Sequence, residues 1–207
     1  MKPTYTGFEA KKSNAFVELP TPGAYIGEIK AVRFLPKDEK KNQQRDQIEM
    51  MIDITEGEFA GRFMEVWEDQ KEQWGDKVPY KGIFRLTPFV DGDEDWRKRA
   101  FEGNLWCVQE SNPGYSWDWD EKKLKGKKIG ISIRKRLYNY EAKDGTTKDG
   151  ETVEIARFET VDDVRNGKIK PMKDRDTRKK KDDEESTDGS KFTDVSGDVD
   201  VPFDWAK

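Results

Sequence analysis

The chain has no histidine and only one cysteine, Cys107, among its 207 residues. The lack of histidine removes the commonest general base and the commonest transition-metal ligand. A single cysteine cannot form an internal disulfide, which is typical of a protein in a reducing compartment, and the two absences together exclude a zinc site built from Cys and His. We therefore expect no cofactor, no metal and a cytoplasmic location.

Long apolar runs and nucleotide-binding motifs are also missing. No stretch approaches the roughly 18 consecutive apolar residues of a transmembrane helix, and the first 16 residues lack the apolar run of a signal peptide. The sequence contains no GxxxxGK[ST], GxSxG or GxGxxG pattern. These absences argue against a membrane protein and against the common enzyme classes, so we expect a protein that is not an enzyme.

Large aromatic rings and charges are abundant. Charged residues make up 40% of the chain, hydrophobic residues 33% and aromatic residues 12%, with seven tryptophans. A disordered protein rarely carries so many large rings, which indicates a folded body with a core that is small for the length.

The negative charge is concentrated at the C-terminal end. Residues 182–207 hold nine acidic residues and two lysines, a net charge of −7, whereas residues 1–181 have a net charge of +3. A block of like charges with few apolar groups cannot bury enough surface to fold. We expect a disordered acidic tail attached to a mildly basic body.

Four segments follow from the composition. We expect a loose leader over 1–20, a folded domain over 21–164, a basic linker over 165–181 and the acidic tail over 182–207. The domain is of ordinary size for a single hydrophobic core.

Alternation of apolar and polar residues predicts a mostly β domain. The clearest strand is 47–55, in which Ile48, Met50, Ile52 and Ile54 fall on one face. Further strands are expected at 24–34, 62–68, 82–86, 127–140 and 151–160. In the strand at 62–68, Phe63, Glu65 and Trp67 share one face. The charge of Glu65 indicates that this face is exposed to solvent.

One helix is expected between these strands. Asp93 and Asp95 can cap a helix over 96–109, and Asn112-Pro113-Gly114 ends it. Its buried stripe is expected to contain Trp96, Phe101, Leu105 and Val108, and Trp106 is also expected in the core. This helix would cover one end of the sheet.

The segment 127–140 is the best candidate binding surface. It contains five basic residues and no acidic one, and period two places the side chains opposite its isoleucines on one face. Cations bind a phosphate backbone, and aromatic rings stack on unpaired bases. The candidate phosphate contacts are Arg62, Lys127, Lys128, Arg134 and Arg136, and the candidate stacking residues are Phe63, Trp67, Trp74, Tyr138 and Tyr140. The alternative is an ordinary solvated face whose rings pack across neighbouring strands.

The acidic tail ends in an apolar tip formed by Val201, Pro202, Phe203 and Trp205. Large apolar side chains on a flexible tail are candidate anchors for a partner's pocket. The tethered polyanion can also compete with nucleic acid for a basic face, because tethering gives it a high local concentration.

The motif from Asp198 to Phe203 resembles the tail tip of bacterial and phage single-stranded DNA-binding proteins, although here four residues follow the phenylalanine. The body resembles phage-encoded members of this class in three patterns: Pro22-Gly23-Ala24-Tyr25, the stretch from Glu56 to Phe63, and Leu124-Lys125-Gly126-Lys127. The resemblance implies an OB-like barrel that binds single-stranded DNA in replication, recombination or repair. It also implies that the tail recruits replication or recombination proteins, and a phage protein would act in the host cytoplasm. A homo-oligomer is compatible with this class.

Two other functions remain open. The chain could be a phage protein-interaction or inhibitory module whose acidic tail mimics DNA and whose barrel binds a host protein. It could also be a Mg-dependent nuclease that uses the acidic cluster Asp91, Asp93, Glu94 and Asp95, because carboxylates alone can bind Mg²⁺. The first predicts a tight protein partner and no affinity for single-stranded DNA, and the second predicts loss of the DNA strand in the presence of metal.

Overall fold

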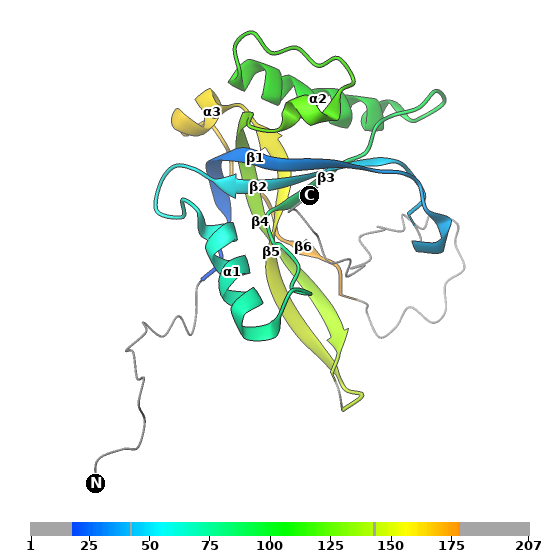
Figure 1. Cartoon of the computed structure of the whole chain (residues 1–207), viewed down its shortest axis with the longest axis vertical. Coiled ribbons are helices and arrows are strands. Elements are labelled where there is room, and N and C mark those ends of the chain that lie inside the picture. Colours follow the sequence, from blue (N-terminus) through cyan, green and yellow to red (C-terminus); the bar gives the residue numbers. More distant parts are fainter. Residues whose placement is uncertain (1–17, 42, 143, 179–207) are drawn as a thin grey trace.

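The computed structural model describes residues 18–41, 43–142 and 144–178. Within these residues the chain is mostly β, with a six-stranded mixed sheet and three α-helices (Figure 1). The strands are β1 (Gly23–Leu35), β2 (Gln47–Ile54), β3 (Ile83–Leu86), β4 (Lys128–Glu141), β5 (Thr147–Glu159) and β6 (Arg175–Asp176). The helices are α1 (Arg62–Trp74), α2 (Asp95–Ser111) and α3 (Val161–Arg165), with short 3-10 helices at Glu39–Lys41 and Glu121–Leu124. Five of the six strand predictions are confirmed.

The long strand β1 connects the two halves of the sheet. The strand order is β3-β2-β1-β4-β5 with antiparallel neighbours, and β6 adds to β4 in parallel. Residues 23–28 of β1 pair with β4 and residues 27–35 pair with β2, and the pairing with β2 has a register shift between Ile29 and Ala31. Such an irregularity bends a strand and increases its twist. The end strands β3 and β5 approach each other through Phe84 and Phe158, whose ring centroids are 4.4 Å apart.

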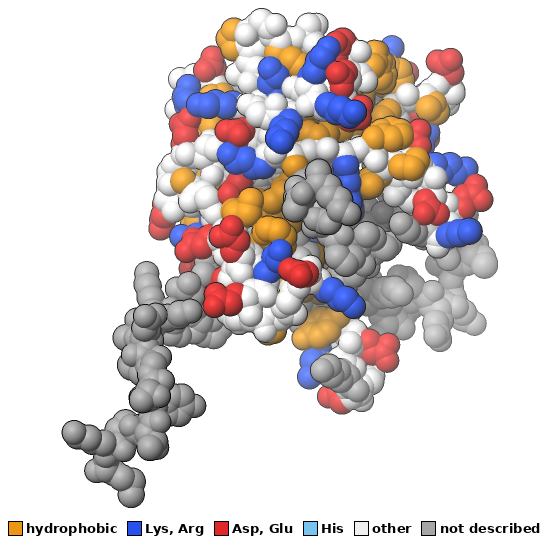
Figure 2. Space-filling model, viewed as in Figure 1, with side chains coloured by type: hydrophobic (Ala, Val, Ile, Leu, Met, Phe, Trp, Pro, Cys, Tyr) orange, Lys and Arg blue, Asp and Glu red, His pale blue; other side chains and the backbone are white. Residues whose placement is uncertain are grey.

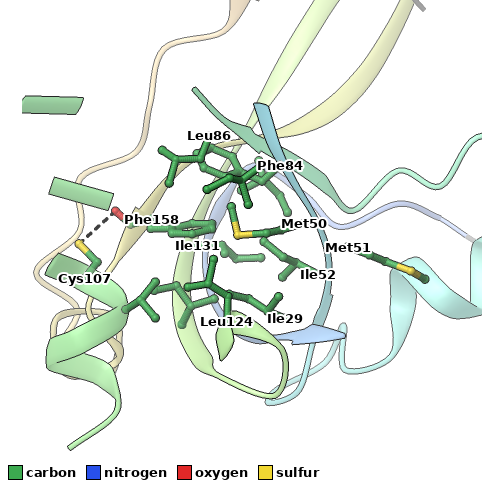
Figure 3. Packing of buried hydrophobic residues seen from close by; sticks show 14 of the residues in the cluster. Ile29, Met50, Met51, Ile52, Phe84, Leu86, Cys107, Leu124, Ile131 and Phe158 are labelled. Carbon is green, nitrogen blue, oxygen red and sulfur yellow. Dashed lines mark hydrogen bonds between the residues drawn. The ribbon is translucent and has the colours of Figure 1, made fainter. Parts of the chain in front are cut away.

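The isoleucine-rich faces of three strands form the core. Figure 3 shows Ile29, Met50, Ile52 and Ile131 converging inside the sheet, as the alternation in β2 and β4 predicts. Met51 points to the other side of β2, toward α1, and is also buried. Both faces of β2 are therefore covered, so its polar positions are buried as well: Glu49 is 1% exposed and Asp53 4% exposed.

The segment predicted as a strand at 62–68 is the start of helix α1, so this prediction is wrong. Phe63 and Val66 are buried against β2, and Phe63 is 1% exposed rather than on a solvent face. The Asp53 Oδ1 atom accepts hydrogen bonds from the backbone amides of Ile54 and Phe63, at 2.9 and 3.1 Å. The buried carboxylate thus binds an amide in the first turn of the helix, the part of a helix that lacks intrahelical acceptors.

Helix α2 lies across one end of the sheet (Figure 1), where the sequence predicted the one helix of the fold. Phe101, Leu105 and Val108 are buried as expected, but Trp96 and Trp106 are 40% and 52% exposed. The expectation that these two tryptophans belong to the core is wrong, because the buried stripe of α2 is completed by Cys107 instead.

The hairpin of β4 and β5 projects from the body at the end opposite α2 (Figure 1). Its loop is shorter than the sequence predicts, since Asp149 and Gly150 belong to β5. The predicted linker 165–181 also contributes to the fold: β6 pairs with β4, and the Thr177 amide donates to the Leu137 carbonyl at 2.8 Å. Pro20, placed in the predicted leader, is fully buried. The acidic tail lies outside the described residues.

No helix among the described residues is long and apolar enough to span a bilayer.

Candidate nucleic-acid interface

The outer face of β4 carries the residues on which the binding prediction depends. Ile129, Ile131 and Ile133 are buried beneath the strand. On the opposite face lie Ser132, Arg134, Arg136, Tyr138 and Tyr140, the first buried, the last exposed and the rest half-buried. The pairing of β4 with β5 is regular from Ile133 to Glu141, so the structure brings these arginines and tyrosines together in one row.

Three arginines surround one carboxylate at the base of this row. The Arg134 Nε atom donates to Glu154 Oε1 at 2.6 Å. Arg136 Nε lies 4.0 Å from Glu154 Oε2, and an Arg175 guanidinium nitrogen lies 3.6 Å from Oε1. We call these four residues the Glu154 cluster. It has three positive charges and one negative charge, and its side chains are 18–28% exposed.

The arginine cluster continues directly into two tyrosine rings. The Arg136 guanidinium lies 5.6 Å from the Tyr138 ring centroid, and the Tyr138 and Tyr140 centroids are 6.2 Å apart. Tyr138 lies across Gly150 of the paired strand β5: a Cβ atom at Gly150 would lie 2.7 Å from the Tyr138 ring. Tyr140 is 47% exposed and follows toward the tip of the hairpin.

The two lysines at the start of β4 lie elsewhere. Lys127 packs its ammonium 4.4 Å from the centroid of the Tyr115 ring, and Lys128 lies 3.9 Å from Glu56. Because a strand rises about 3.3 Å per residue, Lys128 is on the order of 30 Å from Tyr138 along β4. These lysines therefore do not belong to the row formed by Arg134, Arg136, Tyr138 and Tyr140, which we call the arginine–tyrosine row.

The remaining predicted contacts belong to α1. Arg62 makes an ion pair with Glu65 at 3.2 Å and donates to the Glu18 carbonyl. The Trp67 indole nitrogen donates to the Val78 carbonyl at 3.1 Å. Trp74, the last residue of α1, is 70% exposed. Phe63 cannot offer a ring face to a base, because it is buried beneath the helix. The correction has a physical reason: helical spacing turns Phe63 and Trp67 inward, where a strand would have turned them outward.

Arg175 and Glu154 were not among the binding residues predicted from the sequence. Arg175 comes from a segment interpreted as a linker, and it reaches the cluster because β6 pairs with β4 opposite Arg136. The pairing of Arg134 with Glu154 could have been predicted from the sequence, because the two residues lie on facing strands of a predicted hairpin. No local sequence pattern predicts a parallel strand of only two residues, such as β6.

Basic and acidic side chains are interspersed over the described part of the face in Figure 2. On this face, therefore, the basic side chains do not gather into one broad patch.

The acidic cluster considered for Mg²⁺ has structural partners. Asp93 forms an ion pair with Arg45 and accepts a hydrogen bond from the Val90 amide, and the Arg45 guanidinium holds the pKa of Asp93 below its usual value. Glu94 accepts from the indole nitrogen of Trp96. Among the described residues, no group of three or more acidic, cysteine or histidine side chains is arranged to hold a metal ion.

The proposed partner-binding residues Val201, Pro202, Phe203 and Trp205 lie outside the described residues. In comparisons with known proteins, no protein-family model matches the chain and no curated protein matches it.

Proposed function

We propose that this protein binds single-stranded DNA, largely without sequence preference and without catalysis. The observation that carries the proposal is the row on the outer face of β4, where the Glu154 cluster continues into Tyr138 and Tyr140. Arginines bind successive phosphates, and the rings stack on the bases between them.

The tyrosines favour a single strand over a duplex. In a duplex the faces of the bases are covered by their neighbours, whereas an unpaired base exposes a face to an aromatic ring. Stacking does not depend on which base is present, so this arrangement supports binding with little sequence preference. Exposure rises along the row toward the hairpin tip: the side chains of the Glu154 cluster are 18–28% exposed, and Tyr140 is 47% exposed.

We further propose that the domain is an OB-like barrel. Two features support this: the strand order β3-β2-β1-β4-β5, and the contact of Phe84 with Phe158 between the two end strands. Helix α2, between β3 and β4 in the chain, covers one end of the sheet. OB-folds bind oligonucleotides across the face of strands two and three and with the loops that join strands one to two and four to five. In this chain the second of these loops closes the hairpin that carries the tyrosines.

The C-terminal tail gives the proposal its biological context. By its resemblance to the tails of single-stranded DNA-binding proteins, Val201, Pro202, Phe203 and Trp205 would anchor replication, recombination or repair proteins. Self-association of the body would fit the same role.

The proposal is tested by titrating labelled oligo-dT and a matching duplex by fluorescence anisotropy at several salt concentrations, in EDTA. We expect preferential binding of oligo-dT that weakens steeply with salt. Arg136→Gln is expected to weaken binding several-fold, whereas Arg99→Gln on the exposed surface of α2 is the charge-matched control. If oligo-dT does not bind at low salt, even to a chain that ends at residue 181, the proposal is wrong.

A second candidate function is favoured by one observation. Trp119 is 62% exposed and has a φ of 68°, a conformation that is unfavourable for a large side chain. Its ring is held by stacking on Phe101 at 5.7 Å. An exposed tryptophan kept at a cost in strain is typical of a protein-docking site. A protein-interaction module would show no affinity for oligo-dT and would lose its partner on Trp119→Ala.

A further inference from the structure

The solvent side of helix α2 carries two exposed tryptophans with small residues between them. Trp106 is 52% exposed and Trp96 is 40% exposed. They lie ten residues apart, about 15 Å along the helix axis. Ala100 and Gly103 are also exposed, and spacings of three, four and seven residues place side chains on one side of a helix. We call the exposed residues of this side the α2 face: Trp96, Arg99, Ala100, Glu102, Gly103 and Trp106.

Gly103 lies in the middle of α2, although no contact among the described residues requires a glycine there. A Cβ atom at Gly103 would meet none of their heavy atoms within 4 Å. Glycine in the interior of an exposed helix is less stable than alanine, because its backbone loses more freedom on folding. A glycine is favoured where another backbone approaches closely, since it has no side chain to keep that backbone away. The position therefore indicates contact with another molecule.

The α2 face repeats the same chemistry in reverse order about Phe101. One tryptophan stands five residues before Phe101 and the other five residues after it. The small residues Ala100 and Gly103 are centred within half a residue of the same point. The oppositely charged residues Arg99 and Glu102 are centred there too. A two-fold interface joins a residue of one copy to its counterpart across the axis, so this order makes the helix complementary to itself.

The charges of the α2 face favour an antiparallel pair of identical helices. In that arrangement Arg99 of each copy faces Glu102 of the other, whereas a parallel pair in register would place each charge against its like. Glu102 is in reach of a second helix, since its side chain is 54% exposed and Lys98 approaches it only to 3.9 Å. An exposed ion pair contributes little free energy, so the charges select the orientation and loss of the Arg99 charge alone changes the affinity little.

The tryptophan rings supply the apolar area of the contact. The Trp96 ring is oriented by its neighbours, because the Arg97 guanidinium lies 4.4 Å from its centroid and its indole nitrogen donates to Glu94. An antiparallel pair would place Trp96 of one copy beside Trp106 of the other at both ends of the contact. Tryptophan is among the residues that contribute most to binding at protein interfaces.

We propose that the α2 face is a dimer interface, at which α2 packs antiparallel against α2 of a second copy about a two-fold axis near Phe101. Small side chains at the crossing allow the two helix axes to approach closely. One helix from each copy forms a small interface, so the dimer is weak and depends on concentration. This inference goes beyond the proposed function, and its test does not use DNA.

The place of α2 in the fold decides the shape of the dimer. α2 lies across one end of the sheet, and the β4–β5 hairpin projects from the opposite end (Figure 1). The two hairpins of the dimer therefore lie at its two far ends. If the arginine–tyrosine row binds DNA as proposed, one dimer holds two separate strands.

The test measures the mass of the full chain by sedimentation equilibrium over a range of protein concentrations at low salt. We expect a monomer–dimer equilibrium for the wild type. Trp106→Gln is expected to raise the dimer Kd more than about tenfold, the usual effect of removing a tryptophan at the centre of a contact. Trp74→Gln is the matched control, because Trp74 is also an exposed tryptophan on a helix, and its Kd should equal that of the wild type.

Gly103→Gln separates dimerisation from folding. The new side chain fills the space between the helices, so the dimer Kd is expected to rise about tenfold or more. Glutamine is also a better helix former than glycine, so the unfolding temperature at a concentration where both proteins are monomers is expected to rise. Loss of the dimer together with a more stable monomer cannot result from unfolding.

Charge reversal tests the orientation. Arg99→Glu and Glu102→Arg each place like charges opposite one another and are expected to raise the Kd several-fold, whereas Arg99→Glu/Glu102→Arg restores the wild-type Kd. If the wild type is a monomer at every concentration, or associates but is unaffected by Trp106→Gln and Gly103→Gln, the inference is wrong. Failure of the double variant to restore the Kd would overturn the antiparallel pairing. None of these outcomes bears on binding of oligo-dT, which is measured separately.

Discussion

Tyr138 shows how a single residue depends on its cross-strand neighbour. Its ring lies over Gly150, and any side chain at that position would collide with it. The glycine, a weak strand former, therefore lets the ring lie across the hairpin beside Arg136, where a base can stack on it.

Tyr138→Ala is expected to weaken oligo-dT binding by about 1–3 kcal/mol, the usual value of one base–ring stacking contact. Tyr138→Phe is the matched control and is expected to bind like the wild type, because it keeps the ring. Both are measured by anisotropy at a fixed salt concentration. Equal weakening by the two substitutions would show that the hydroxyl acts rather than the ring.

Asp53 is a buried acid whose ionisation is coupled to folding. Burial raises the pKa of Asp53, and hydrogen bonds from the amides of Ile54, Phe63 and Met64 oppose this in part. The folded state therefore holds the proton more tightly than the unfolded state, so the contribution of Asp53 to stability is greatest at low pH and is lost as pH rises through its folded pKa.

Asp53→Asn keeps the acceptor oxygen and removes the titration. We expect the unfolding free energy of the wild type, relative to this variant, to fall as pH rises from about 4 and then to level off. Urea denaturation between about pH 3 and pH 7 checks the sign. A difference that grows with pH would contradict the assignment.

Cys107 is expected to be unreactive in the native protein. Burial raises the pKa of the Cys107 thiol to about 11, and its Sγ lies 3.6 Å from the Phe158 carbonyl oxygen. Because the thiolate is the reactive form, labelling by a disulfide reagent near pH 8 should be slow in buffer and fast in urea. Fast labelling of the folded chain would place the thiol at the surface.

At the scale of elements, α1 and β6 show that contacts with neighbouring strands decide the secondary structure of a segment. Residues 62–68 alternate like a strand, but Phe63, Val66 and Trp67 also have helical spacing, and the residues that follow are good helix formers. The first turn of the helix is stabilised by Asp53 of β2, which accepts a hydrogen bond from the Phe63 amide. The two-residue strand β6 exists because the edge of β4 next to Arg136 offers unpaired backbone groups.

A chain that ends at residue 174 is expected to bind oligo-dT more weakly than one that ends at residue 178. The shorter chain loses β6, and with it Arg175 from the Glu154 cluster and the hydrogen bond of Thr177 with Leu137. Both chains lack the acidic tail, so the comparison isolates residues 175–178, which contain β6 and Arg178. Equal affinities by anisotropy would mean that Arg175 does not contact the DNA.

At the scale of the whole molecule, charge is divided between the body and the tail. The net charge of −4 hides a body at +3 and a tail at −7. The last described residue, Arg178, is held to Asp149 at 3.2 Å, so the remaining chain departs from beside the β4–β5 hairpin. A polyanion attached there has a high local concentration at the arginine–tyrosine row.

Removal of residues 182–207 is therefore expected to tighten oligo-dT binding at low salt, because the competing polyanion is gone. The gain should shrink as salt rises, since salt screens the attraction between tail and body. Titrations of the full and shortened chains at two salt concentrations measure both effects. An unchanged affinity at low salt would rule out competition by the tail.

The sequence by itself determined five of the six strands among the described residues, and their inward faces. The isoleucines of β2 and β4 recur every second residue, and this period shows which side chains face the core. It also determined the row of Arg134, Arg136, Tyr138 and Tyr140, because these residues share one strand. The division of charge between body and tail follows from composition.

Only the tertiary structure decided the features that depend on contacts between distant segments. The Glu154 cluster needs β6 beside β4, and the ion pairs of the buried Glu49 with Arg33 and Arg85 need three strands in register. The burial of Phe63 depends on α1 packing on the outer face of β2, which short-range alternation does not encode. Strand pairing and helix packing join residues tens of positions apart, so a local pattern shows which face a side chain occupies and the packed fold decides what it meets there.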